Sequence, residues 1–313
     1  DSYAGESFYN DKMDEIVAML EEKGLLTESD GAKIVDLTDY GMPPCLILKK
    51  DGATLYATRD LAAAFYRKRT YDFKKALYVV AYQQDLHFGQ LFKVLELMGC
   101  EWAKDMEHVA FGMVSFEGET LSTRKGHIVY LEDLLQTAIA KARGIIEEKS
   151  PNLENKDEVA REVGVGAVVF FDLYNNRIKD IDFWWDRARN FEGETGPYVQ
   201  YTHARCCSVL RKAGSRDASP DYAALADAQA QDVTRMLEQF PGVILTAIER
   251  SEPSMITRFV VDLAQVYNRF YFEHRILDEE PGVREARLRL TEAARNTIKT
   301  ALNLIGIAAP ERM

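Results

Sequence analysis

Residues 122–126, with the sequence STRKG, place two hydroxyl groups and two cations directly before a glycine. Ser122 and Thr123 supply the hydroxyls, and Arg124 and Lys125 supply the positive charge. Charge-assisted donors this close together suit a polyphosphate, because they meet negative charge where it accumulates. The same segment, called the STRKG loop below, also fits an exposed basic turn, and its spacing alone leaves both interpretations open.

A second candidate site lies where a predicted strand, residues 53–57, runs into a predicted helix, residues 58–69. Tyr56 would end the strand, Thr58 would cap the helix, and Asp60 would fall in the first helical turn. Ligands of α/β folds bind at the carboxyl ends of strands, and a carboxylate there suits a planar guanidinium through a two-point pair. The alternative is that Asp60 only complements the helix dipole, an effect of about 0.3–1 kcal/mol. The spacing by itself favours that structural role.

A polar cluster follows the apolar run of residues 76–81, which is typical of a strand buried in a parallel sheet. Gln83, Gln84, Asp85 and His87 occupy this second junction between a strand and a helix. A single histidine is more often structural than catalytic, but a polar cluster directly after a buried strand is harder to explain by packing. The cluster is therefore a candidate for ligand binding.

The fourth candidate is the helix predicted for residues 196–213, which begins with a Gly-Pro pair. Tyr198, Tyr201 and Arg205 recur at spacings of three and four, so they share one face of this helix. Aromatic rings beside an arginine suit stacking on unpaired bases. The same face fits the polar edge of a helical-bundle core nearly as well.

Hydrophobic periodicity predicts an α/β layer up to residue 127 and a helical bundle after it. In the first part, helices are predicted for residues 6–24, 58–69 and 83–99, and strands for residues 33–37, 45–50, 53–57, 76–81 and 108–114. An Asp-Gly pair between the second and third strands predicts a hairpin turn. In the second part, helices are predicted for residues 130–149, 156–175, 196–213, 222–249, 253–274 and 283–305.

The run GVGAVV at residues 164–169 looks like the start of a dinucleotide-binding fingerprint. It lacks the third glycine, and it lies within a helical pattern and not after a strand. Small residues that allow close helix packing are the better explanation.

The chain has 313 residues, 47% of them hydrophobic, and a net charge of −11. This length allows two or three domains, and the acidic charge argues against a general nucleic-acid binder but not against a local basic track. Apolar runs are too short to span a membrane, and we expect no secretory signal. The four cysteines form no C-x-x-C pair, so we expect a protein of the reducing cytoplasm without a bound metal.

Taken together and in order, these stretches resemble the arginyl-tRNA synthetases, a family of class I aminoacyl-tRNA synthetases. The resemblance runs along essentially the whole chain, in the blocks DSYAGESFY, DGATLYATRDLAAA, QQDLHFGQ, LSTRKGHIVYLEDLL, TGPYVQYTHAR and ALNLIGIAAPERM. The Y-x-T-R-D and G-P-Y-x-Q-Y-x-x-A-R runs are the most specific. Six blocks in register carry far more weight than any single one.

The resemblance implies an enzyme that activates L-arginine with ATP, which Mg²⁺ accompanies, and transfers the arginyl group to the terminal ribose of tRNA-Arg. By similarity, Tyr56, Asp60 and Gln84 hold the arginine side chain, with Asp60 pairing its guanidinium. His87 would lie near the nucleotide. No tightly bound cofactor, no membrane partner and a monomeric state are expected.

By the same similarity, the STRKG loop corresponds to the K-M-S-K-S loop of class I enzymes, which steadies the triphosphate. The catalytic residues would be Ser122, Thr123, Arg124 and Lys125, with Lys125 also binding ATP. Threonine stands where the second signature lysine aligns, so whether Arg124 or Lys125 takes its charge role stays open. The residues expected to contact tRNA are Tyr198, Gln200, Tyr201, Arg205 and Arg211.

The chain departs from the family in one larger respect. The class I signature His-x-Gly-His is not present, since no two of its histidines are three residues apart. We therefore expect a C-terminal portion of the enzyme that is inactive alone and lacks the N-terminal domain and the His-x-Gly-His half of the catalytic domain. The expected fold is a partial α/β nucleotide-binding (Rossmann-like) domain followed by an all-α helical-bundle anticodon-binding domain. The expected parts are the C-terminal part of the catalytic domain at residues 1–127, ending in the STRKG loop, a helical linker or stem-contact region at 128–192 and the helical anticodon-binding domain at 193–313.

Other functions explain part of the pattern. Another class I synthetase, such as the cysteinyl one, shares a similar helical domain, but a Cys/His zinc constellation is missing and the position of Asp60 disfavours it. A stand-alone tRNA-binding module without catalysis would explain the helical part. A general phosphate-binding α/β protein would explain the STRKG loop but not the bundle.

Overall fold

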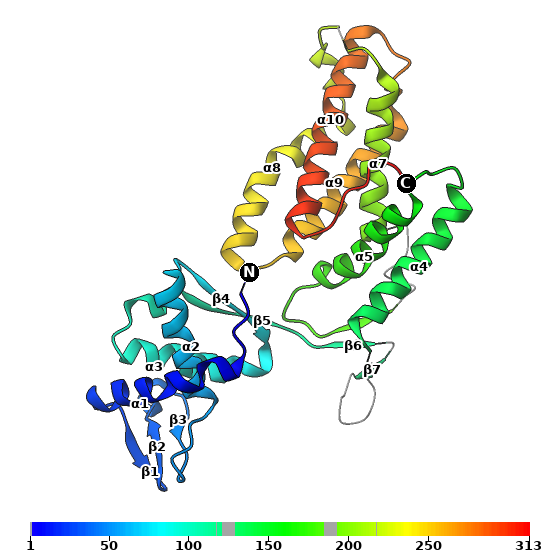
Figure 1. Cartoon of the computed structure of the whole chain (residues 1–313). Helices are drawn as coiled ribbons and strands as arrows, with labels where there is room; N and C mark the ends of the chain where they lie inside the picture. The colour runs from blue at the N-terminus through cyan, green and yellow to red at the C-terminus, as the bar shows by residue number, and fades with distance from the viewer. Residues whose placement is uncertain (1, 117, 121–128, 185–192, 217) are drawn as a thin grey trace. The chain divides into compact units, whose positions relative to one another are not determined.

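The computed structural model describes residues 2–116, 118–120, 129–184, 193–216 and 218–313, which form two compact units. Unit 1 comprises residues 1–112 and unit 2 residues 113–313. Figure 1 shows that unit 1 mixes helices with short strands, whereas long helices make up most of unit 2. The predicted fold class, an α/β part followed by a helical bundle, is confirmed.

Unit 1 contains two small sheets and three α-helices. Its elements are η1 (Glu6–Lys12), α1 (Met13–Glu22), β1 (Thr27–Ser29), β2 (Ala32–Val35), η2 (Thr38–Tyr40), β3 (Cys45–Leu48), α2 (Tyr56–Tyr71), β4 (Ala76–Ala81), η3 (Tyr82–Gln84), α3 (Asp85–Leu97), η4 (Glu101–Asp105) and β5 (Met106–Phe111). β1, β2 and β3 form an antiparallel sheet in that order, and β4 pairs in parallel with β5. The unit β4–α3–β5 is thus the predicted βαβ motif, and the carboxyl end of β4 leads through η3 into α3.

The start of α2 differs from the prediction. Residues 53–57 form no strand, because the turn at Gly52 (φ +78°) is followed only by a single bridge between Leu48 and Thr54. Tyr56 begins α2, so Asp60 falls in the second helical turn. Thr58 does not cap the helix: its hydroxyl is buried and donates to the carbonyl of Ile47 over 2.6 Å. This bond fixes α2 against the end of β3.

Unit 2 contains helices and a short sheet, one strand of which lies between α5 and α7 in the chain. Its elements are β6 (Val114–Phe116), β7 (Glu119–Thr120), α4 (Leu131–Lys149), α5 (Lys156–Tyr174), β8 (Ile181–Phe183), α7 (Gly196–Ala213), η6 (Tyr222–Leu225), α8 (Ala228–Arg250), α9 (Ser254–Glu273) and α10 (Pro281–Leu304). The predicted helices are confirmed to within a few residues at most ends. The core of the bundle comes mainly from α7, α8, α9 and α10.

Strand β8 was not predicted, and the strand expected at residues 108–114 is two strands. β5 ends at Phe111, and β6 begins at Val114 and pairs in parallel with β8. Phe183 of β8 is buried, and its ring stacks on that of Phe116 at 5.8 Å between centroids. A three-residue strand has no periodicity to read, so only its distant partner reveals it.

Two glycines of α5 confirm that the GVGAVV run serves helix packing. A Cβ atom on Gly164 would lie 2.7 Å from the backbone of Ile139 in α4, and one on Gly166 would lie 2.8 Å from Nε2 of Gln200 in α7. Real Cβ contacts are essentially never this short. Helix α5 therefore approaches both neighbours closely only because these positions carry no side chain.

We predict that Gly164→Ala destabilises the protein by about 1–3 kcal/mol, the usual cost of over-packing a tight interface. The matched control is Gly144→Ala in α4, where the added Cβ meets no atom within 4 Å. That change should stabilise by roughly 0.5–1 kcal/mol, because alanine loses less backbone entropy than glycine on folding. Urea unfolding followed by circular dichroism measures both, and a gain of stability in both variants would contradict the close α4–α5 contact.

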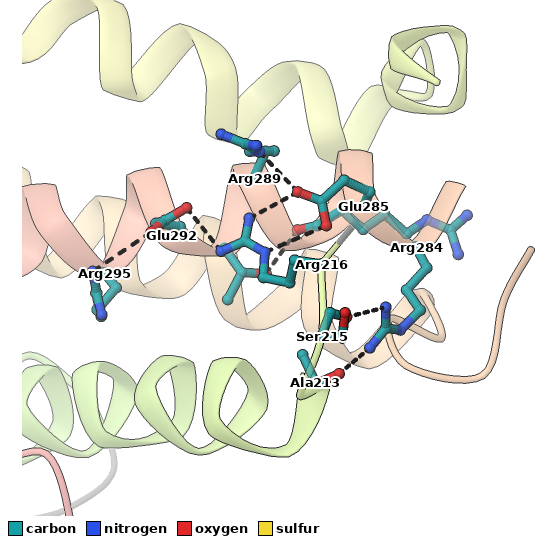
Figure 2. A network of polar contacts seen from close by, with 10 residues as sticks. Ala213, Ser215, Arg216, Arg284, Glu285, Arg289, Glu292 and Arg295 are labelled. Atoms are coloured by element: carbon teal, nitrogen blue, oxygen red, sulfur yellow. Dashed lines mark hydrogen bonds and ion pairs between the residues drawn. The ribbon is translucent and has the colours of Figure 1, made fainter. Parts of the chain in front are cut away.

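The segment that follows α7 is bound to α10 by charged side chains (Figure 2). Arg216 donates to both carboxylate oxygens of Glu285, over 3.1 and 3.3 Å, and to Glu292 over 3.0 Å. Glu285 also accepts from Arg289 over 2.8 Å, and its side chain is fully buried. Burial of a carboxylate is costly unless it is paired and hydrogen-bonded, and here the two arginines provide that pairing.

Helix α10 also supplies hydrogen-bond donors to carbonyl groups at the carboxyl end of α7. Arg284 donates to the carbonyl oxygens of Ala213 and Ser215, as Figure 2 shows. The last carbonyls of a helix have no partner within it, and a cation there also complements the helix dipole. The two contacts together hold the carboxyl end of α7 against α10.

We predict that Glu285→Ala lowers the free energy of unfolding by about 2–3 kcal/mol. Removing one member of a fully buried ion pair usually costs roughly 3–5 kcal/mol. The loss is smaller because Arg216 keeps its bond to Glu292. The control Glu292→Ala removes a partly exposed carboxylate and should cost under about 1 kcal/mol. Equal losses in the two variants, measured by chemical denaturation, would show that burial of Glu285 is not what matters.

The pH dependence of stability tests the same interaction between Glu285 and its two arginines. Burial acts to raise the pKa of Glu285, but the bonds from Arg216 and Arg289 outweigh it, so its pKa lies below the ordinary 4.5. A carboxyl group with a lowered pKa in the folded protein contributes fully to stability above its pKa in the unfolded chain. That contribution is lost as the pH falls through the pKa of the folded protein. The stability difference between wild type and Glu285→Gln should therefore shrink below about pH 4.5.

Candidate functional site

The predicted catalytic residues Ser122, Thr123, Arg124 and Lys125 lie outside the described residues, so the STRKG loop stays a sequence-based prediction. The remaining predicted site residues all lie in the described part of the chain. They fall into two groups, one in unit 1 and one in unit 2.

Asp60 of α2 and His87 of α3 contact each other in unit 1. Nε2 of His87 lies 2.6 Å from Oδ2 of Asp60, and both side chains remain partly exposed. The neighbouring residues Leu61 and Phe88 are buried in the core, which fixes how each helix presents its polar residue. The structure thus joins two residues that the sequence places at separate junctions.

Tyr56 and Gln84 lie one turn before this pair. Tyr56 begins α2, four residues before Asp60, and Gln84 directly precedes α3, three residues before His87. Both are exposed, and residues at these spacings share a helix face. A carboxylate and an amide oxygen can both accept from a guanidinium, which has only N–H donors. The group has the chemistry, and the access to solvent, that an arginine side chain requires.

His108 of β5 fixes the junction at which this group lies. Its Nδ1 is 3.0 Å from Oδ1 of Asp85, and its Nε2 is 3.0 Å from the carbonyl oxygen of Val80. Its ring also packs on Phe88, with 4.5 Å between centroids. The sequence grouped Asp85 with the ligand candidates and missed this pair, since only the parallel pairing of β4 with β5 brings His108 beside α3.

A cavity of about 1300 Å³ opens in unit 2 between the end of α4, one face of α7, the end of α9 and the last residues of the chain. We call it the α7–α9 groove. Its charged lining consists of Lys149, Arg205, Arg211, Lys212, Arg275 and Arg312 against Glu273, Asp278 and Glu311. In a chain with a net charge of −11, this local excess of cations indicates an anionic ligand.

Arg205 lies among aromatic rings in the α7–α9 groove. Its guanidinium carbon is 5.0 Å from the ring centre of Tyr201, 5.1 Å from that of Tyr271 and 5.3 Å from that of Phe272. Phe272 is 75% exposed and Tyr201 is 44% exposed. Exposed rings beside a guanidinium suit an unpaired nucleotide, whose base stacks while its phosphate meets positive charge.

Most of the predicted tRNA contacts gather at this groove. Tyr201, Arg205 and Arg211 line it, and Tyr198 lies partly buried on the same stripe of α7. The part of the lining that comes from outside α7 was not predicted from the sequence. The run YFEHR at residues 271–275 carried a signal, because two aromatic residues and a cation follow the buried stripe of α9.

Gln200 is the exception, because the structure does not place its side chain in the groove. Its side chain is fully buried, and Nε2 donates to the carbonyls of Glu162 and Ala308 over 3.2 and 2.9 Å. These bonds tie α7 to α5 and to the end of the chain. Gln200 holds the helix that carries the groove and does not face it.

The cysteines of the described part are packing residues. All four are free thiols, and burial raises the pKa of Cys45 to about 11 and that of Cys206 to about 12, so both stay neutral near pH 7. Among the described residues, His, Cys, Asp and Glu side chains form no group of three or more that could hold a metal ion. No helix within those ranges has the length and apolar character of a membrane span.

Two known families match the chain, and the boundary between them falls within unit 2. A family model described as tRNA synthetases class I (R), catalytic domain, matches residues 2–185, and one described as DALR anticodon binding domain matches residues 199–313. The chain therefore belongs to the class I aminoacyl-tRNA synthetases. Within that class it belongs to the arginyl-tRNA synthetase family, as the six sequence blocks predicted.

Individual relatives agree with the family. An arginine–tRNA ligase of Clostridioides difficile (strain 630) is 58% identical over 314 residues, and one of Alkaliphilus metalliredigens (strain QYMF) is 57% identical over the same length. Each alignment covers all of this chain and 56% of the relative, so the chain spans about half the length of the curated relatives it matches. Among solved structures, Thermus thermophilus arginyl-tRNA synthetase is similar with a TM-score of 0.90 and 29% identity, over 97% of this chain and 58% of that chain.

Proposed function

We propose that the chain is part of an enzyme that joins L-arginine to tRNA-Arg with the energy of ATP. The observation that carries the proposal is the identity of 57–58%, along the whole chain, to two proteins named arginine–tRNA ligase. In this reaction the carboxylate of arginine attacks the α-phosphorus of ATP and releases pyrophosphate. A hydroxyl of the terminal ribose of tRNA then attacks the arginyl carbonyl and releases AMP.

Unit 1 contributes the arginine-binding residues in this proposal. Asp60 pairs with the substrate guanidinium, Gln84 accepts from it and Tyr56 packs beside it. The contact of 2.6 Å from His87 orients the Asp60 carboxylate, and His87 lies close to the bound nucleotide. Ser122, Thr123, Arg124 and Lys125 steady the triphosphate, with Mg²⁺ bound to ATP as part of the substrate.

Unit 2 contributes the tRNA-binding surface. The α7–α9 groove is lined by cations and exposed rings, which is the combination that holds unpaired nucleotides. The anticodon loop of tRNA-Arg is the single-stranded partner that fits it. We assign residues 1–127 to the C-terminal part of the catalytic domain, 128–192 to a helical linker that contacts the tRNA stem and 193–313 to anticodon binding.

We also propose where the protein acts and in which oligomeric state. It acts in the cytoplasm as a monomer, without a tightly bound cofactor. The 313 residues do not turn over alone, because the His-x-Gly-His signature is not among them. ATP–pyrophosphate exchange by this chain alone would contradict that part of the proposal.

The first experiment is binding of the 313-residue chain to a tRNA-Arg transcript and to a non-cognate tRNA at two salt concentrations. A preference for tRNA-Arg that survives the higher salt supports specific recognition by the α7–α9 groove. Weak binding without preference, lost as salt rises, is the signature of phosphate contacts only. That result would contradict the assignment of the groove.

We predict that Asp60→Asn in the full-length enzyme raises KM for arginine roughly 30- to 800-fold, the equivalent of about 2–4 kcal/mol for a lost charge-assisted pair. Asp72→Asn is the matched control, since Asp72 stands at the other end of α2 in a surface ion pair with Lys68. It should leave KM unchanged. Steady-state pyrophosphate exchange measures both, and an unaltered KM in Asp60→Asn would remove that carboxylate from the arginine site.

We predict that Phe272→Ala weakens binding of tRNA-Arg by about 1–3 kcal/mol, the contribution of stacking one base on an aromatic ring. Folding stability should hardly change, because the ring is 75% exposed. Leu245→Ala on α8 removes a side chain that is 69% exposed and lies outside the groove lining. Fluorescence anisotropy with labelled tRNA tests the pair, and equal affinities for the two variants would argue against stacking on Phe272.

A further inference from the structure

Asn268 of α9 joins three side chains of α7 behind the groove. Its Nδ2 donates to the hydroxyls of Tyr198 and Thr202, each over 2.9 Å, and its Oδ1 accepts from Nη1 of Arg205. The three partners stand four and three residues apart, so they form one stripe of α7. Asn268 itself is only 6% exposed and is not part of the groove lining.

The chemistry of its partners dictates the orientation of this amide. A guanidinium has only N–H donors, so the amide oxygen must face Arg205. The Thr202 hydroxyl donates to the carbonyl of Tyr198 over 3.0 Å, so it accepts from the amide nitrogen. If the amide were flipped, its N–H groups would face the N–H groups of Arg205, and no hydrogen bond could form between them. Asn268 therefore has one arrangement in which its bonds are satisfied.

This bond limits the freedom of Arg205. An arginine side chain carries about 2 kcal/mol of rotamer entropy, but a guanidinium held in place loses less on forming each bond. One of its nitrogens donates to Asn268, and its guanidinium carbon lies within 5.3 Å of three ring centres. Within the described ranges no other group accepts from this guanidinium, so its other N–H groups can bind a ligand in the groove.

We propose that Asn268 is a positioning residue for RNA recognition: it holds the guanidinium of Arg205 in the plane at which that group meets an unpaired nucleotide of the tRNA. The inference rests on the proposed assignment of the α7–α9 groove to tRNA. It adds a residue that touches no RNA itself and acts only through Arg205. Loss of Asn268 should therefore affect recognition no more than loss of Arg205.

The test is a double-mutant cycle on the 313-residue chain with Arg205→Ala, Asn268→Ala and the double variant. The quantity measured is the ratio of dissociation constants for non-cognate tRNA and tRNA-Arg, at the same two salt concentrations. Asn268→Ala should lower this preference about three- to tenfold, within the usual range for coupled neighbours. The double variant should match Arg205→Ala, because Asn268 has nothing left to position.

Thr202→Val is the matched control for a loss of stability. It removes one partner of the Asn268 amide but leaves the bond from Arg205 to Asn268 in place, and Thr202 is fully buried. Its unfolding free energy should fall, as that of Asn268→Ala does, while its preference for tRNA-Arg stays at the wild-type value. An equal loss of preference in Thr202→Val would show that general loosening of α7, and not the position of Arg205, is responsible.

Two further outcomes separate this inference from the proposed function. If Arg205→Ala lowers the preference and Asn268→Ala does not, or if the two effects add in the double variant, the positioning role is overturned and the groove assignment stands. If Arg205→Ala itself leaves affinity and preference unchanged, the assignment of the groove to tRNA is wrong, and the inference falls with it.

Discussion

The close approach of α5 to its two neighbours is the constraint on which unit 2 depends. Cβ atoms on Gly164 and Gly166 would collide with α4 and with Gln200 of α7, and one on Gly196 would lie 2.9 Å from the carbonyl oxygen of Gly166. Dense packing tolerates no extra methyl group at such contacts. Because α7 carries the residues of the groove, the position of the groove follows from glycines that take no part in it.

Polar contacts then fix α7 along its length. Gln200 bonds it to α5 and to the end of the chain, Asn268 bonds it to α9, and Arg284 of α10 holds its carboxyl end. Each contact uses a side chain that is buried or spans two helices, so each is specific in direction as well as stabilising. A helix held in this way can present Arg205 and its neighbouring rings at a defined place, which is what recognition of a single-stranded nucleotide requires.

In unit 1, polar contacts also fix the helices that carry the candidate site residues. The hydroxyl of Thr58 fixes the start of α2 to β3, and His108 fixes the start of α3 to β4 and β5. The two helices then bring Asp60 and His87 into contact at the carboxyl end of β4. The acidic chain thus carries a partly exposed carboxylate beside a histidine in one unit and a groove with an excess of cations in the other.

The sequence by itself determined the class of fold, most of the helices and the family, because those rest on periodicity and on blocks of residues that lie close together in the chain. It also predicts Asp60, His87, Tyr201 and Arg205 as site residues, because their residue types stand out locally. Only the tertiary structure decided that Asp60 meets His87, that Gln200 is buried and that Asn268 holds Arg205. It also revealed β8, and it moved the start of α2 to Tyr56. These are contacts between residues far apart in sequence or choices between two faces of one helix, and side-chain packing settles them where local propensity does not.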